Sequence, residues 1–129
     1  MNKVEVIKSF NTILSDFLNQ ISPLIGNSYH TKYNILVKVN ATYPIKRFSE
    51  YATEHEEQIM NRNPEYFMDE NVYKDEIEKN YGDDSELYMD RILQFKEIYK
   101  QVDKESQDNL WDIIQALLLL SKKYLELTQ

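Results

Sequence analysis

The chain has 129 residues and a net charge of −7, with two glycines, three prolines and no cysteine. A chain of this length forms one domain with a core of its own, so we expect residues 1–129 to be a single domain. So few glycines and prolines favour helices over a sheet-rich fold, which needs more turns. The lack of cysteine excludes disulfides, thiolate nucleophiles and cysteine metal sites, and it is typical of a reducing compartment.

Targeting and membrane signals are not visible in the sequence. Residues 1–11 lack the continuous apolar stretch and the small-residue cleavage site of a signal peptide. The apolar run from Trp111 to Leu120 is shorter than the roughly 18 residues that a membrane span needs. We therefore expect an intracellular protein that does not contact a membrane.

Charge is unevenly distributed along the chain. Ten carboxylates and only two lysines lie between Glu65 and Asp90, and such a segment repels phosphate backbones. The basic residues that could oppose it are few, so the charge distribution disfavours nucleic acid as a partner. They are Lys32, Lys38, Lys46 and Arg47.

Residues 3–21 are predicted to form the clearest amphipathic helix. Their apolar residues recur at helical spacing and fall in one arc, whereas the opposite side is polar. Phe10 and Phe17 belong to the apolar arc, and we expect both in the core. Ser22 and Pro23 are predicted to end this helix, because proline disfavours helical backbone in the residue before it.

A second helix is predicted from about Tyr29 to Asn40, after a turn at Gly26 and with Ser28 as its cap. The segment from Ile35 to Val39 also has strand propensity, but the sequence offers no second strand to pair with it. Helix is therefore the favoured interpretation.

A third helix is predicted to begin at Pro44, which suits the first helical position, and to run to about Met60. Asn63 then caps a short turn opened by Pro64. The residues expected to face inward are Ile45, Phe48, Ala52 and Ile59. Two further helices are predicted at residues 72–81 and 87–102.

The last helix is predicted to follow Asp103 as its cap and to end near Leu127. Its apolar face would complete the core with that of the first helix, giving an all-α bundle of about five helices. The core residues expected on this helix are Leu110, Ile114 and Leu117. Ser121 falls among them, and its hydroxyl can bond back to the Leu117 carbonyl.

Three apolar residues fall on otherwise polar helix faces. They are Leu119 in the last helix, and Met89 and Leu93 in the preceding one. Such residues indicate a second packing surface. Another helix of the same bundle, a second copy of the chain or a different protein could each cover it.

The two histidines do not predict a catalytic or metal site. A zinc-protease helix needs two histidines one turn apart, but the residue one turn after His55 is Ile59. We expect His55 on a solvated surface and His30 at a helix edge near two tyrosines. No serine neighbours a histidine in the sequence, and no glycine-rich loop could hold a phosphate. The sequence thus predicts a protein that is not an enzyme and binds no cofactor.

Hydrophobic positions along most of the chain resemble a known family. The residues that carry the resemblance are Phe10-Asn11, Ile59, Tyr66-Phe67, Leu110-Trp111, Ile114-Gln115 and Leu117. The chain resembles small uncharacterised helical proteins of nucleocytoplasmic large DNA viruses, the giant viruses related to mimiviruses and phycodnaviruses. It departs from them in the longer acidic stretch between Tyr73 and Asp90.

The resemblance implies a non-enzymatic role in the cytoplasm or virus factory of an infected cell, or in the virion, and it transfers no functional residues. The leading hypothesis is a structural, scaffold or accessory module that binds a protein partner, either a different protein or a second copy, through Leu119, Met89 and Leu93. The alternative is a nucleic-acid accessory factor that uses the four basic residues named above as a stripe.

Overall fold

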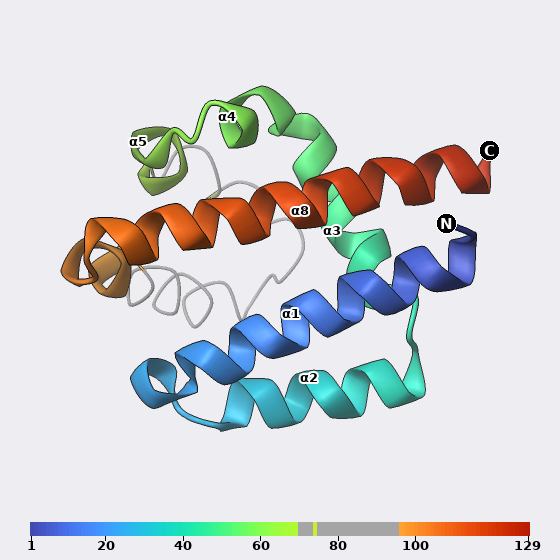
Figure 1. Cartoon of the computed structure of the whole chain (residues 1–129), viewed down its shortest axis with the longest axis horizontal. Helices are drawn as coiled ribbons and strands as arrows, with labels where there is room; N and C mark the ends of the chain where they lie inside the picture. The colour runs from blue at the N-terminus through green and yellow to red at the C-terminus, as the bar shows by residue number, and fades with distance from the viewer. Residues whose placement is uncertain (70–73, 75–95) are drawn as a thin grey trace.

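Two long helices, α1 (Lys3–Ile25) and α8 (Lys104–Thr128), lie side by side and enclose much of the core (Figure 1). The computed structural model describes residues 1–69, 74 and 96–129. Within these residues every regular element is a helix, which confirms the predicted all-α bundle. The first and last residues of the chain lie at the same end of the α1–α8 pair (Figure 1), so the two helices are antiparallel.

The start of α1 is fixed by a capping box. The Asn2 side chain accepts a hydrogen bond from the Glu5 backbone N–H at 2.9 Å, and the Asn2 N–H donates to the Glu5 carboxylate at 3.5 Å. These bonds satisfy backbone donors that the first helical turn leaves without partners. The helix therefore begins at Lys3, as the sequence predicted.

The helix α1 continues through Pro23, so the predicted stop at Ser22 and Pro23 is wrong. Proline cannot donate to the Asn19 carbonyl as another residue would, but the Ser22 hydroxyl donates to that carbonyl at 2.8 Å. The helix ends instead before Gly26, whose φ of 91° is readily adopted by glycine alone. Replacement of the missing hydrogen bond explains why Pro23 is tolerated in the last turn.

The second helix, α2 (Ser28–Val39), confirms the helical interpretation of this segment. It packs on α1, and in Figure 1 α1 lies between α2 and α8. The prediction that Ser28 caps it is wrong, because Ser28 is already helical and Asn27 precedes it without a side-chain cap. No residue of α2 is fully buried, which distinguishes it from the long helices.

The predicted third helix is interrupted at His55. It forms α3 (Tyr43–Glu54) and the short α4 (Glu56–Met60), and α5 (Pro64–Met68) follows, with the Asn63 side chain accepting from the Tyr66 N–H as predicted. His55 has φ −117° and ψ 19°, outside helical values. The change of direction lets Ile59 pack against α8 while Ile45 packs against α1 and α8.

Buried side chains form two neighbouring clusters. The first joins α1, α3 and α8, and the second joins α3, α4 and α8. The first consists of Val6, Phe10, Ile45, Leu117 and Tyr124, and the second of Ala52, Ile59 and Leu118. Among the residues expected in the core, Phe10 and Leu117 are buried, and Phe17, Leu110 and Ile114 are half-buried.

The last helix agrees with the sequence prediction at its cap, at its end near Leu127 and at the buried Ser121. Asp103 accepts a hydrogen bond from the Ser106 N–H at 2.8 Å, as an N-cap does. Ser121 donates to the Leu117 carbonyl at 2.8 Å, as expected for a buried serine in a helix. The helix predicted at residues 72–81 and most of that at 87–102 lie outside the described residues, and residues 96–101 are helical.

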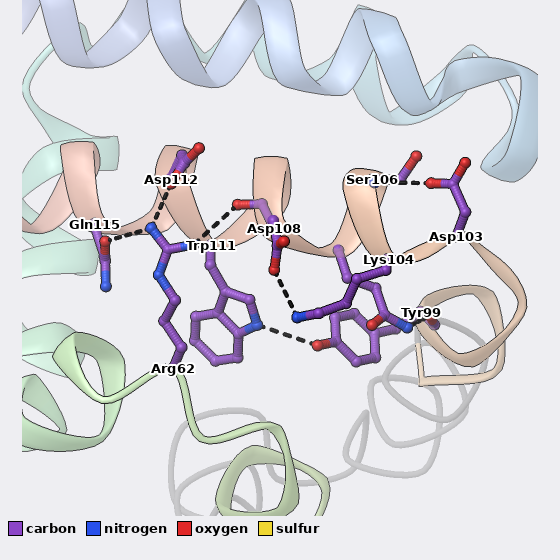
Figure 2. Close-up of polar contacts among 10 residues, drawn as sticks. Arg62, Tyr99, Asp103, Lys104, Ser106, Asp108, Trp111, Asp112 and Gln115 are labelled. Carbon is purple, nitrogen blue, oxygen red and sulfur yellow. Dashed lines mark hydrogen bonds and ion pairs between the residues drawn. The ribbon is translucent and has the colours of Figure 1, made fainter.

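An arginine connects the α4–α5 turn to α8 (Figure 2). Arg62 pairs with Asp112, and its guanidinium also donates to the Gln115 side chain at 3.0 Å and to the Asp108 carbonyl at 3.4 Å. Arg62 has a φ of 50°, a left-handed conformation that is unfavourable for a residue with a Cβ. The three contacts with α8 offset that strain and fix the turn against the helix.

We expect Arg62→Ala to lower the free energy of unfolding by about 1–2 kcal/mol, because it removes three polar contacts and keeps the strained φ. Chemical denaturation measures this loss. The matched control is Lys104→Ala, which removes only an exposed ion pair with Asp108 of 2.8 Å and should leave the denaturation midpoint unchanged, because water and salt screen such a pair. Equal losses in the two variants would contradict the role of Arg62.

We also expect Leu117→Ala to cost about 2–5 kcal/mol, because it leaves a cavity in the first cluster. Leu119→Ala, two residues away on the same helix, is the matched control. Leu117 is 3% exposed and Leu119 is 59% exposed, so the control should stay within about 0.5 kcal/mol of the original protein. If thermal denaturation gave the same midpoint for both variants, the assignment of this core would fail.

Candidate functional site

The edge of the bundle formed by α1 and α2 combines a polar contact layer, a groove and an exposed apolar face. A polar network attaches α2 to α1 and to the segment that follows α2. Asn11, which is almost fully buried, donates to the Ala41 carbonyl at 2.8 Å, and the Tyr33 hydroxyl donates to the Asn11 side-chain oxygen at 3.1 Å. Burial raises the pKa of Tyr33 to about 12, so its hydroxyl remains a donor throughout the neutral range.

A second polar group joins Ser15 of α1 to His30 and Asn34 of α2. Ser15 Oγ lies 3.2 Å from His30 Nε2 and 3.1 Å from Asn34 Oδ1, and Asn34 Nδ2 lies 3.2 Å from the same histidine nitrogen. The Asn34 amide nitrogen can only donate, so in this contact His30 Nε2 is the acceptor. The Ser15 hydroxyl then donates to the Asn34 oxygen.

The structure therefore brings a serine to a histidine, which the sequence analysis did not foresee. The two residues are far apart along the chain, so only helix packing juxtaposes them. The histidine nitrogen nearest Ser15 already accepts from Asn34, and a nucleophile–base pair needs that nitrogen to take the serine proton. The geometry is that of a polar bridge between two helices.

A groove of about 600 Å³ runs along this edge. Its walls come from α1, from α2 and from the segment that joins α2 to α3. Residues that line it include Val4, Ile7, Asn11, Ser15, Tyr33 and Val37. The groove is thus mixed in character, apolar near the start of α1 and polar where Ser15 and Asn34 meet.

The outer face of α2 presents aliphatic side chains to solvent. Ile35 and Val39 are one helical turn apart and are 57% and 81% exposed. Lys32 and Lys38 flank them and are also exposed. The sequence analysis considered Ile35 and Val39 only for strand propensity. Their position opposite Tyr33 and Val37 on a helical wheel is the signal that could have identified this face.

The surface predicted from the sequence is partly outside the described residues. Leu119 lies on α8 and is 59% exposed, beside Lys122, which forms an ion pair with Glu56. Met89 and Leu93 lie outside the described residues, so the grouping of the three residues stays a prediction. Of the four basic residues, Lys32 and Lys38 are on α2, and Lys46 and Arg47 are on α3.

The prediction that His55 is a solvated surface residue is wrong. His55 is half-buried, its Nδ1 lies 2.8 Å from the Tyr66 hydroxyl, and its ring centre is 4.6 Å from that of Tyr51 and 6.0 Å from that of Phe67. Sequence spacing could not reveal this contact, because the break between α3 and α4 creates it. Within the described part of the chain, no three histidine or carboxylate side chains gather as a metal site would require.

The fold and this edge define an all-α helical domain, and none of its described helices is long and apolar enough to cross a membrane. The chain is 24% identical over 135 residues to an uncharacterised protein of Acanthamoeba polyphaga mimivirus, a match that covers 97% of this chain and 73% of that protein. It therefore resembles giant-virus proteins, as the sequence indicated. No protein-family profile and no solved structure matches the chain.

We expect Tyr33→Phe to loosen α2 without unfolding the bundle. The change leaves the buried Asn11 side-chain oxygen without its hydrogen-bond donor. This should weaken the α1–α2 contact by about 1 kcal/mol. Hydrogen exchange should accelerate at α2 amides and stay unchanged in α8. The control is Tyr43→Phe, since the hydroxyl of this exposed tyrosine bonds to none of the described residues. Faster exchange in both helices would show that α2 is not a separately attached element.

Proposed function

We propose that the protein is a non-enzymatic interaction module, a structural, scaffold or accessory component of viral origin that works by binding another protein. The resemblance to a mimivirus protein supports the viral origin. One observation carries the interaction role: large aliphatic side chains project from otherwise polar helix faces on two sides of the domain. These side chains are Ile35 and Val39 on α2 and Leu119 on α8.

Exposed aliphatic residues cost little as single side chains, but a pair one turn apart forms a contiguous apolar area. Protein interfaces have such areas at their centre, surrounded by polar and charged residues. Burying one large aliphatic side chain contributes about 1.5–3 kcal/mol, so two or three such residues can anchor a partner. A partner for this protein is either a different protein or a second copy of the chain.

Site-specific photo-crosslinking tests this proposal. A photoreactive residue placed at position 35 or 119, in the cells in which the protein is made, should yield covalent protein adducts. Matched controls are position 20 on α1 and position 53 on α3, where the exposed residues Gln20 and Thr53 are polar and lie on other helices. Adducts should be at least about tenfold more abundant at the apolar positions. Equal yields at all four positions would contradict an interaction role for these faces.

Sedimentation distinguishes a second copy from a different partner. A species heavier than the 15.5 kDa chain at high concentration would identify self-association. A mass of 15.5 kDa throughout, together with adducts to another protein, would identify a different partner.

A second candidate function is that of a nucleic-acid accessory factor. It is favoured by the segment from residue 17 to residue 49, which contains no aspartate or glutamate but holds Lys32, Lys38, Lys46 and Arg47. Binding through these residues would weaken steeply with added salt, because it would release counterions from the phosphates. An absence of any mobility shift with DNA or RNA at low salt would dismiss this function.

A further inference from the structure

The outer face of α2 has its apolar residues at the centre and its charged residues at the margins. At 100° per residue, Ile35 and Val39 lie within a narrow arc directly opposite the residues that face α1. Lys32 borders this arc on one side and Lys38 on the other. We name the four residues Ile35, Val39, Lys32 and Lys38 the α2 face. Such an arrangement is that of a small interface, with an apolar centre and a charged rim.

The charge around the α2 face is opposite to that of the protein as a whole. The chain has a net charge of −7, yet the stretch between Asp16 and Glu50 contains no carboxylate. Among the described residues, no carboxylate forms an ion pair with Lys32 or Lys38. Lys32 and Lys38 are both exposed to solvent. A partner with negative charges would be attracted to this side of the domain and repelled by the rest.

The α2 helix is packed less extensively on the domain than the core helices are, so a partner could stabilise it further. No α2 residue is fully buried, and its contacts with α1 include the polar bridges from Tyr33, His30 and Asn34. Most helical stability in proteins comes from packing of an apolar face. A helix with little buried surface therefore gains more stability than a core helix does when a second helix packs against it.

We propose that the α2 face docks an acidic amphipathic helix of a protein partner. Apolar side chains of that helix cover Ile35 and Val39, and its carboxylates pair with Lys32 and Lys38. The α2 helix has 12 residues and a length of about 18 Å, which matches a partner helix of three to four turns. This inference rests on the proposed interaction role and specifies its surface and the chemistry of its partner.

A phosphate backbone fits the same face less well. It would contact the two lysines but leave Ile35 and Val39 without an apolar partner. An anionic membrane would accept both kinds of residue, yet stable attachment needs more cations than the two on this face, in a chain whose net charge is −7. An acidic amphipathic helix can contact the aliphatic pair with its apolar side chains and pair its carboxylates with the two lysines.

Two designed peptides test the proposal. Each is a helix of about 18 residues with the same leucine stripe; glutamates flank the stripe in one and lysines in the other. Fluorescence anisotropy should show that the full chain binds the glutamate-flanked peptide at least about tenfold more tightly, with the difference shrinking in high salt. Equal affinities for the two peptides would overturn the proposal.

Substitutions in α2 locate the binding. Lys32→Glu combined with Lys38→Glu should reverse the preference between the peptides. Ile35→Ser combined with Val39→Ser should weaken binding of both at least about tenfold while circular dichroism stays unchanged, because serine has a helix propensity close to those of isoleucine and valine. The matched control is Leu127→Ser, an exposed aliphatic residue on α8 outside the proposed binding faces, which should bind as the original protein does. A charge reversal without effect would overturn the proposal.

Other occupants give distinct results in the same experiments. Tighter binding to duplex DNA or to phosphatidylserine vesicles, lost in the Ile35 and Val39 variant, would overturn the proposal in favour of that ligand. A dimer that dissociates in this variant would overturn it in favour of a second copy. If neither peptide binds while photo-crosslinks form at position 119, this inference fails and the proposed interaction role stands.

Discussion

The burial of apolar side chains between α1 and α8 is the interaction on which the rest of the structure depends. Phe10 from α1 and Leu117 from α8 belong to the same cluster, and Ile45 brings α3 against both helices. The second cluster uses the next residue of α8, Leu118, to hold α3 and α4. The last helix therefore contacts nearly every other described element, whereas α2 depends on α1.

The long helices could be predicted from the sequence because their apolar residues keep a helical period over many turns. Their caps, Asp103 above all, act on neighbouring backbone and are also visible in the sequence. Two of the errors fall where the position of a single side chain accompanies a local change in the backbone. The Ser22 hydroxyl lets α1 pass Pro23, and the contact of His55 with Tyr66 accompanies a break that periodicity does not indicate. Such effects depend on where one side chain lies, and a pattern averaged over several turns cannot detect them.

Candidate sites were harder to predict than helices for a different physical reason. The meeting of Ser15 with His30 requires two helices to pack in one register, and the sequence contains no sign of that register. The two exposed aliphatic residues of α2 were visible in the sequence but were interpreted as strand propensity. Isoleucine and valine favour strands because they are β-branched, and the same branching makes them compact apolar contacts on a helix surface. Leu119 was correctly placed on the polar face of the last helix, where it is 59% exposed.

The antiparallel pairing of α1 and α8 determines how the domain would respond to mechanical load. Both ends of the chain lie at the same end of the pair (Figure 1), so tension between them acts perpendicular to the helix axes. It first separates Lys3 from the Tyr124 ring, which are in contact at that end. The interface would then open turn by turn, with few contacts bearing the force at any moment. A tether that gripped the domain at opposite ends of the pair would instead strain all of these contacts together. Tension applied through residues 1 and 129 therefore meets less resistance from the α1–α8 contact than tension applied along the helix axes.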